Sequence, residues 1–254
     1  MTPQTPESPP VIDRVSPTRR PNRRAVMRQD WHKLLFVHWE VPPEQLRPLL
    51  PPGLELDLYE GRAYVGLVPF TMTGVRPVFL PPVPGLSSFH ETNVRTYVHF
   101  EGRNPGVWFF SLDAENRMAV LGARTVFHLP YYFAQMTLNT NGGGTNVYRS
   151  ERRWPRPLPG SCSVEAKFFG PIAPANVGTL EHFLVERYIL YASRRDRLYL
   201  GRIHHAPYPL QSASVTALDE TLLAAAGIAR PDQTPLAHYA SEVNVEVFPL
   251  ERVK

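Results

Sequence analysis

A single stretch, residues 89–100, constrains the fold more than any other part of this 254-residue sequence. Its odd positions from 91 to 97 carry charged or hydrogen-bonding side chains, and its even positions from 92 to 98 carry threonine and valine. Successive side chains of a β-strand point to opposite faces, so this alternation predicts a strand with one polar face. A polar face beside apolar neighbours either meets bulk water or lines a pocket, and the functional interpretation depends on which holds.

Most of the remaining chain is also typical of β-structure. The run Ala63–Phe70 is apolar at both parities, which predicts a strand covered on both sides. Short strand-like runs separated by turn residues continue toward the C-terminus, with about four short helical segments between them. The pattern predicts an α+β fold that is predominantly antiparallel β.

The segment after the polar strand contains the clearest helix signal. Asp113 is expected to cap a helix that runs from about residue 114 to residue 127, and Pro130 is expected to end it. Arg117 and Arg124 are seven residues apart and would share one stripe of this helix. A further strand is expected to begin at Tyr131.

The basic character of the sequence, with a pI near 9.3, comes from its N-terminus. Residues 1–28 contain six arginines and two acidic residues, which accounts for the whole formal net charge of +4. The rest is neutral, so we expect no specific nucleic-acid partner. Residues 1–26 are rich in Pro, Ser, Thr and Arg. We therefore expect a disordered Pro/Arg-rich arm over residues 1–26 and a single domain over residues 27–254.

Other classes of protein are disfavoured by simple features. The sequence has no run of about 18 apolar residues, so we expect no membrane partner. The N-terminus lacks the apolar core of a signal peptide. Cys162 is the only cysteine, which fits a cytoplasmic location without an intrachain disulfide. A homo-oligomer is compatible with the sequence.

Three kinds of catalytic chemistry can be compared with the residues present. The nine histidines form no His-x-x-x-His or Glu-x-x-His cluster, so we expect no metal and no other cofactor. No Gly-x-Ser-x-Gly motif occurs, and Cys162 lacks the local signature of a nucleophile. Imine chemistry would need one of only three lysines, Lys33, Lys167 or Lys254, and no motif marks any of them.

Several motifs occur in a specific order and spacing over roughly residues 28–250. They are Trp31-His32-x-Leu34-x-Phe36-x-His38-Trp39, Leu49-x-Pro51-x-Gly53-Leu54, Gly61-x-Ala63-Tyr64-Val65-Gly66-x-Val68-Pro69-Phe70, Glu91-x-Asn93-Val94-Arg95-Thr96-Tyr97 and Leu129-Pro130-Tyr131-Tyr132. These motifs resemble the uncharacterised YqjF-like family, domain of unknown function 2071. That family is similar to the acetoacetate decarboxylase superfamily. The resemblance implies an acetoacetate-decarboxylase-like β-barrel or cone with a few short covering helices and an interior cavity for a small molecule.

One position departs from the decarboxylase pattern. Acetoacetate decarboxylases carry a Pro-Lys-Lys element that supplies the lysine for imine formation, whereas the similar segment here reads Pro130-Tyr131-Tyr132. A tyrosine cannot form an imine, so the resemblance implies the cavity but not the decarboxylase mechanism.

The resulting hypothesis is an internal polar and aromatic cavity that binds a small carboxylate-bearing or carbonyl metabolite. Glu91 is expected to act as general base or hydrogen-bond acceptor, with Arg124 or Arg76 as its charged partner. Whether the protein is an enzyme or a non-catalytic ligand sensor or interaction module stays open. The expected ligand-binding residues are Asn93, Arg95, Arg76, Arg117, Arg124, Tyr131, Tyr132, Tyr64 and His38.

Overall fold

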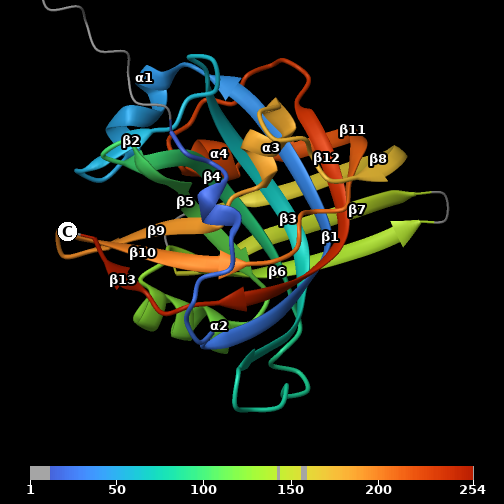
Figure 1. Ribbon diagram of the computed structural model, residues 1–254. Coiled ribbons are helices and arrows are strands. Elements are labelled where there is room, and N and C mark those ends of the chain that lie inside the picture. The colour runs from blue at the N-terminus through green and yellow to red at the C-terminus, as the bar shows by residue number, and fades with distance from the viewer. Residues whose placement is uncertain (1–11, 142–143, 156–158, 254) are drawn as a thin grey trace, which may run out of the picture.

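Strands dominate the structure, a computed structural model that describes residues 12–141, 144–155 and 159–253 (Figure 1). Most neighbouring strands pair antiparallel, with β5–β6 and β5–β9 as parallel pairs, so the predicted α+β class with predominantly antiparallel strands is confirmed. The described residues form β1 (Met27–Val41), β2 (Leu54–Leu56), β3 (Ala63–Pro77), β4 (Phe89–Phe100), β5 (Arg103–Ala114), β6 (Tyr131–Asn141), β7 (Thr145–Trp154), β8 (Ser161–Ala173), β9 (Ile189–Arg194), β10 (Arg197–His204), β11 (Leu210–Glu220), β12 (Leu236–Val247) and β13 (Glu251–Arg252).

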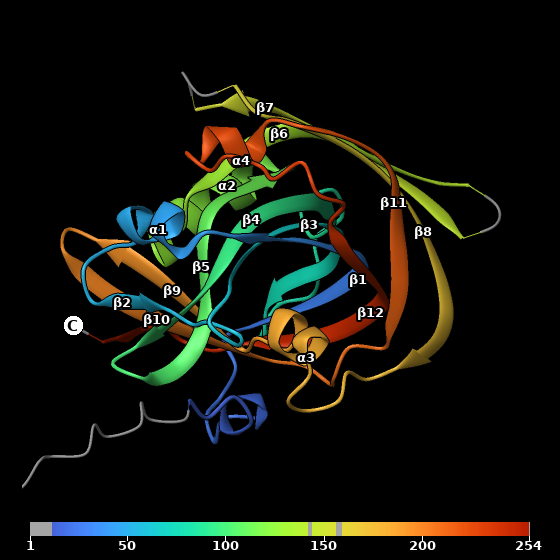
Figure 2. The same cartoon turned by 90° about the horizontal axis from the view of Figure 1, so that it is seen from above.

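The sheet closes on itself in two ways. In the large ring, the strand order β5, β6, β7, β8, β11, β12, β1, β3, β4 returns to β5, because β4 pairs with β5. In the small ring, β9 and β10 connect β5 to β12 directly. The strands β12, β1, β3, β4 and β5 belong to both rings, whose arrangement Figure 2 shows from above.

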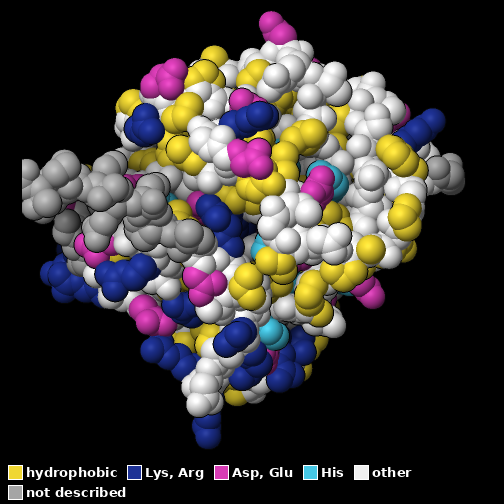
Figure 3. Space-filling view, turned by 45° about the horizontal axis from the view of Figure 1, so that its top comes forward, with side chains coloured by type: hydrophobic (Ala, Val, Ile, Leu, Met, Phe, Trp, Pro, Cys, Tyr) yellow, Lys and Arg dark blue, Asp and Glu magenta, His cyan; other side chains and the backbone are white. Residues whose placement is uncertain are grey.

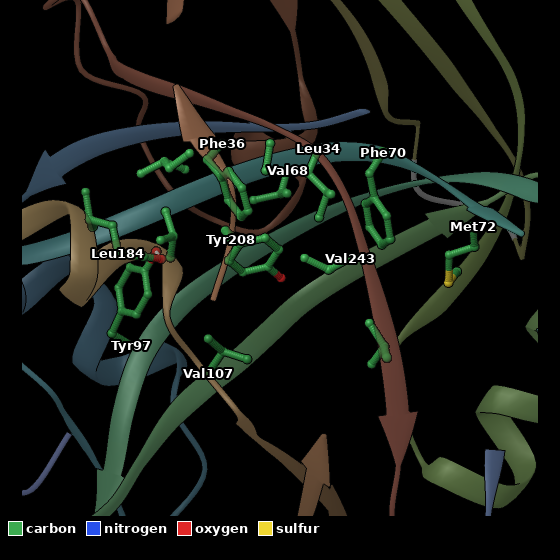
Figure 4. Packing of buried hydrophobic residues seen from close by; sticks show 14 of the residues in the cluster. Leu34, Phe36, Val68, Phe70, Met72, Tyr97, Val107, Leu184, Tyr208 and Val243 are labelled. Atoms are coloured by element: carbon green, nitrogen blue, oxygen red, sulfur yellow. Dashed lines mark hydrogen bonds between the residues drawn. The ribbon is translucent and has the colours of Figure 1, made fainter. Parts of the chain in front are cut away.

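Each ring has its own apolar core, and β4 separates them. On the odd-numbered face of β4, Tyr97 packs with Phe36 and Phe183 in the small ring, part of which Figure 4 shows. On the even-numbered face, Val94 packs with Trp39 and other apolar residues in the large ring. The alternation in the sequence therefore corresponds to two different interiors.

The odd-numbered side chains of β4 form what we call the polar row: Glu91, Asn93, Arg95 and Tyr97. They are 3%, 4%, 8% and 0% exposed, respectively. The polar row therefore lies inside the small ring and is withdrawn from bulk water.

Short helices lie at the edges of the rings. The described residues contain α1 (Pro43–Leu46), α2 (Arg117–Gly122), α3 (Leu180–Val185) and α4 (Leu222–Ala225), with 3-10 turns η1 (Ser16–Thr18) and η2 (Arg47–Leu49) and a π-helical turn η3 (Ala123–Phe127). Seen from above, α3 lies inside the outline of the small ring (Figure 2). Within the described residues, no helix is long and apolar enough to cross a membrane.

The expected cap of the helix that follows β5 is wrong. Asn116 caps α2, and its side chain accepts hydrogen bonds from the backbone N–H groups of Met118 and Ala119. Asp113 instead belongs to β5, where Arg152 of β7 binds its carboxylate. The helix begins three residues later than predicted because the strand continues through Asp113.

Residues 12–26, which we call the N-terminal strap, lie against the domain. Arg20 pairs with Glu246 on β12 and Arg23 pairs with Glu251 on β13, both at 2.6 Å. Arg14 pairs with Asp57. The predicted disordered arm is therefore wrong over residues 12–26, because its arginines meet acidic residues from distant parts of the chain. Basic and acidic side chains likewise lie among each other on the face shown in Figure 3. Residues 1–11 lie outside the described residues.

Candidate functional site

One end of the polar row is a carboxyl–phenol pair. The hydroxyl of Tyr131, at the start of β6, donates a hydrogen bond of 2.7 Å to Oε2 of Glu91. Burial raises the pKa of Glu91 to about 7, while the hydrogen bonds from Tyr131 and Asn93 act in the opposite direction. Burial and the neighbouring Glu91 raise the pKa of the Tyr131 hydroxyl well above its ordinary value. Near neutral pH, Glu91 can therefore either take up or release a proton.

The other end of the polar row is tied to α3. The backbone carbonyl of Leu184 accepts hydrogen bonds from Nη2 of Arg95 at 3.0 Å and from the Tyr97 hydroxyl at 2.7 Å. The Tyr97 oxygen also lies 2.7 Å from Nε2 of His38 on β1. Burial, and then the positive charge of Arg95, hold the pKa of His38 well below its ordinary value, so its imidazole is neutral at pH 7.

Arg95 is a buried cation without a counter-charge. Among the residues that the structure describes, no Asp or Glu side chain lies within ion-pair distance of it. Its guanidinium lies 5.6 Å from the ring centre of Phe36 and 5.8 Å from that of Tyr97. Aromatic faces compensate a buried positive charge only in part, so Arg95 is suited to receive an anion.

Unpartnered polar atoms gather on the same interior. They are Nδ1 of His38, Oδ1 of Asn93, Nε of Arg95 and Nε2 of His205, none of which has a hydrogen-bond partner within the described parts of the chain. Buried polar atoms in folded proteins nearly always have a partner. Four such atoms around one row leave hydrogen-bonding capacity that the described residues do not use.

Two residues that the sequence reasoning missed complete this interior. His205 and Tyr208 lie between β10 and β11, with ring centres 4.4 Å apart, and Tyr208 is 5.1 Å from Phe36. Figure 4 shows Tyr208 between Phe36 and Val107. Burial lowers the pKa of His205 to about 4, and the charge of Arg95 contributes to this shift. No local pattern marked these residues, because they are more than 100 positions from β4.

The predicted ligand-binding residues divide into two groups. Tyr131 and His38 do meet the polar row. Tyr64 packs its ring against Phe183 at 6.2 Å, within the small-ring core. Tyr132 points to the opposite face from Tyr131, and the guanidinium of Arg152 covers its ring at 3.8 Å.

Among the described residues, none of the three remaining predicted arginines forms an ion pair with Glu91. Arg76 donates to the carbonyl of Gly74 near the end of β3, and Arg124 donates to the backbone carbonyl of Tyr131. Arg117 is exposed and lines a surface hollow of about 420 Å³ beside α2. The expectation that Arg124 or Arg76 pairs with Glu91 is therefore wrong, since the partner of Glu91 is the Tyr131 hydroxyl.

The lysines form no described contact with this arrangement. Lys33 donates to Thr140, Lys167 is exposed, and Lys254 lies outside the described residues. Among the described residues, no three His, Cys, Asp or Glu side chains form a group that could hold a metal ion. The described groups are thus suited to hydrogen bonding, anion binding and proton transfer.

Solved structures with a similar fold include acetoacetate decarboxylases. The acetoacetate decarboxylase of Legionella pneumophila matches with a TM-score of 0.62 at 13% identity, covering 94% of each chain. The enduracididine biosynthesis enzyme MppR, complexed with the condensation product of pyruvate and imidazole 4-carboxaldehyde, matches with a TM-score of 0.61 at 16% identity, covering 91% of this chain and 90% of that one. At such low identity these similarities establish the fold.

Sequence comparison defines the relationship more closely. The uncharacterized protein YqjF of Bacillus subtilis (strain 168) is 42% identical over 233 residues, which cover 89% of this chain and 92% of that protein. The family model DUF2071, described as an uncharacterized conserved protein, matches residues 28–244. The resemblance predicted from the sequence motifs is confirmed, and the chain belongs to the DUF2071 family, on an acetoacetate-decarboxylase-like fold.

Proposed function

We propose that the small ring binds a small carboxylate-bearing carbonyl metabolite along the polar row. The observation that carries this proposal is Arg95, a guanidinium that is 8% exposed and has no acidic partner among the described residues. A guanidinium presents parallel N–H groups that match the two oxygens of a carboxylate. Binding an anion would supply the missing counter-charge and partner the free Nε of Arg95.

The other residues of the polar row determine how such a ligand would lie and whether a proton could be transferred to or from it. Arg95 and Glu91 are four residues apart on β4, about 13 Å along the backbone, with Asn93 between them. A ligand held by its carboxylate at Arg95 would place its other polar groups near Asn93 and point its far end toward Glu91. With a pKa near 7, Glu91 could move a proton to or from a carbon beside a carbonyl group.

Two solved structures of one protein with this fold support the ligand class. MppR has been seen with pyruvate and with a pyruvate condensation product, and both are carboxylates with a carbonyl origin. In this chain no described lysine contacts the polar row, because Lys33 donates to Thr140 and Lys167 is exposed. The proposed chemistry is therefore proton transfer without an imine.

A ligand sensor without catalysis is the alternative on the same site. The Glu91 carboxylate already accepts hydrogen bonds from Tyr131 and Asn93. In that case Glu91 and the two residues that donate to it would only shape and polarise the interior. The same ligand class would bind, but no bond of it would change.

Pyruvate binding measured by calorimetry tests the proposal. Arg95→Met keeps the length of the side chain and removes the charge, so pyruvate affinity should fall by at least about tenfold, the effect of losing a charge-assisted hydrogen bond. Arg103→Met is the matched control, since Arg103 is an exposed arginine on the neighbouring strand β5. Equal pyruvate affinity in the Arg95→Met variant and the wild type would refute the assignment of Arg95.

Glu91→Gln distinguishes the enzyme from the sensor. Glutamine can still accept the hydrogen bond from Tyr131 but cannot take up a proton as a base. If the protein is an enzyme, deuterium exchange beside the carbonyl group of a longer oxo acid such as 5-oxohexanoate, which can extend from Arg95 toward Glu91, should stop in this variant while the acid still binds, as followed by NMR. Absence of exchange in the wild type, with binding intact, would favour the sensor.

A further inference from the structure

The helix α3 covers the end of the small ring at which the polar row meets Leu184. Phe183, Leu184 and Val185 are at most 1% exposed and belong to the small-ring core. In Figure 4, Leu184 lies beside Tyr97. A helix of six residues is too short to be stable by itself, so the position of α3 depends on contacts at its ends.

The C-terminal end of α3 is held by a buried carboxylate. Arg187, two residues beyond α3, donates from Nη1 to Oδ2 of Asp57 at 2.7 Å, and its guanidinium lies 4.2 Å from the ring of Phe183. The Asp57 side chain is fully buried, and Arg14 of the N-terminal strap binds its other oxygen. Arg14 also lies over the ring of Phe183, at 5.2 Å.

The N-terminal side of α3 is held by Tyr59, two residues after Asp57. The hydroxyl of Tyr59 donates to the carbonyl of Gly178 at 3.0 Å, and the Tyr59 ring lies 5.4 Å from that of Phe183. Arg14 reaches this turn a second time, because it donates to the carbonyl of Leu58 at 3.3 Å. Residues 57–59, which we call the anchor turn, therefore fasten both ends of α3, and the N-terminal strap fastens the anchor turn.

The cations at this end also fit an anionic ligand. Nη2 of Arg187 is buried and has no hydrogen-bond partner among the described residues. Arg187 lies 4.8 Å from the ring of Tyr97, which in turn bonds His38 and Leu184 inside the ring. Arg187 and Arg95 therefore both lie near Tyr97, at the end of the polar row that α3 covers.

We propose that α3 is a movable plug over the polar row, that the ligand enters beneath it, and that Arg14 and Tyr59 act as positioning residues that hold it closed. The ligand in this proposal is the one given under the proposed function, but the movement of α3 can be tested without any ligand. Lifting α3 would remove the Leu184 carbonyl from Arg95 and Tyr97 and free both donors for the incoming carboxylate. Closing α3 would restore the positions of both side chains.

Hydrogen–deuterium exchange of residues 180–185, measured by mass spectrometry on the unliganded protein, tests the mechanics. Arg14→Met and Tyr59→Phe each remove contacts made only in the closed form, so exchange in α3 should accelerate roughly tenfold. Arg20→Met is the control, because Arg20 fastens the same strap to Glu246 on β12. Exchange in α3 that is unchanged in both variants would overturn the plug, whether or not any ligand binds.

Stopped-flow binding of pyruvate tests the route. In Arg14→Met and Tyr59→Phe, association and dissociation should both become several-fold faster, while Arg20→Met keeps the wild-type rates. If α3 exchanges faster but the pyruvate rates stay the same, the ligand enters elsewhere and the plug proposal is overturned. If pyruvate fails to bind the wild type while α3 exchange responds as expected, the proposed ligand fails and the fastening of α3 stands.

Discussion

Glu91 shows how a single residue can connect stability with function. Its carboxyl group is buried, so the neutral form is favoured, and the pKa rises from 4.5 to about 7. The folded state therefore holds a proton more tightly than the unfolded chain between these two pH values. The associated stabilisation is fully present below pH 4.5 and is lost as the pH rises to about 7. A group arranged in this way serves proton transfer near neutral pH at the expense of stability.

The pH dependence of unfolding by urea should reveal this residue. From pH 4.5 to pH 8 the wild type should lose roughly 3 kcal/mol that Glu91→Gln does not lose, because glutamine does not titrate. The measurement is the difference in free energy of unfolding between variant and wild type at each pH. Parallel profiles for the two proteins would show that Glu91 does not have a raised pKa.

Arg95 also links the stability of the fold with ligand binding. A buried cation without a counter-charge destabilises the fold, so Arg95→Met should leave the melting temperature unchanged or raise it while it weakens pyruvate binding. Thermal unfolding of the same two proteins used for calorimetry checks this. A fall of several degrees would mean that the arginine is needed for packing, and the binding loss could then reflect damage to the interior.

Among the structural elements, β5, β6 and β7 are held together by a buried ion pair. Arg152 on β7 binds both oxygens of Asp113 on β5, with Nη2 to Oδ1 at 2.7 Å, and its guanidinium covers Tyr132 on β6. Both charged side chains are at most 2% exposed. This pair lies on the large-ring face of the sheet, opposite the polar row. It holds Tyr132 of β6 in place, and the adjacent Tyr131 binds Glu91 on the other face.

Removing one partner of this pair should be costly. Arg152→Met leaves a buried carboxylate alone and should lower the free energy of unfolding at pH 7 by about 3–5 kcal/mol. Adding Asp113→Asn should recover part of that loss, because it removes the unpaired charge. Arg153→Met is the control, since Arg153 forms an exposed pair with Glu151. Urea denaturation measures all three, and equal losses for Arg152→Met and Arg153→Met would contradict the role of the buried pair.

How much the sequence predicted also varies between elements. The alternation in residues 89–100 was sufficient to define β4 with its bounds and to place the polar row on one face. Contacts between strands could not be read in the same way. Asp113 looked like a helix cap because its partner Arg152 is 39 residues away, and the partner of Glu91 proved to be a tyrosine hydroxyl instead of an arginine. Periodicity records which face a residue occupies, whereas its partner depends on strand order.

For the whole molecule, the N-terminal strap joins distant parts of the fold. Composition alone predicted a free arm, since arginine and proline disfavour a core. Its arginines instead pair with Asp57, Glu246 and Glu251, which belong to the anchor turn and to the last two strands. Those acids could not be assigned to the strap from sequence, because they are 43 to 228 positions away from their partners.

Deletion of residues 1–24 measures the contribution of the strap. Exposed ion pairs contribute little individually, but the loss of Arg14 also leaves Asp57 with a single cation. We expect the melting temperature to fall by roughly 2–6 °C for a domain of this size. The full-length chain with Arg14, Arg20 and Arg23 all changed to Met should show most of that fall. An unchanged melting temperature in both proteins would restore the free-arm interpretation.

The two closures of the sheet have a consequence for the order in which the protein can form. β12 pairs with β1, β10 and β11, and it is needed to close both rings. It is also made after eleven of the other strands, more than 200 residues later than the start of its partner β1. While the chain leaves the ribosome, neither interior can be sealed, and both faces of β4 stay open to solvent or to chaperones. Non-local closure of this kind slows folding, so the nascent chain should depend on protection until its last strands emerge.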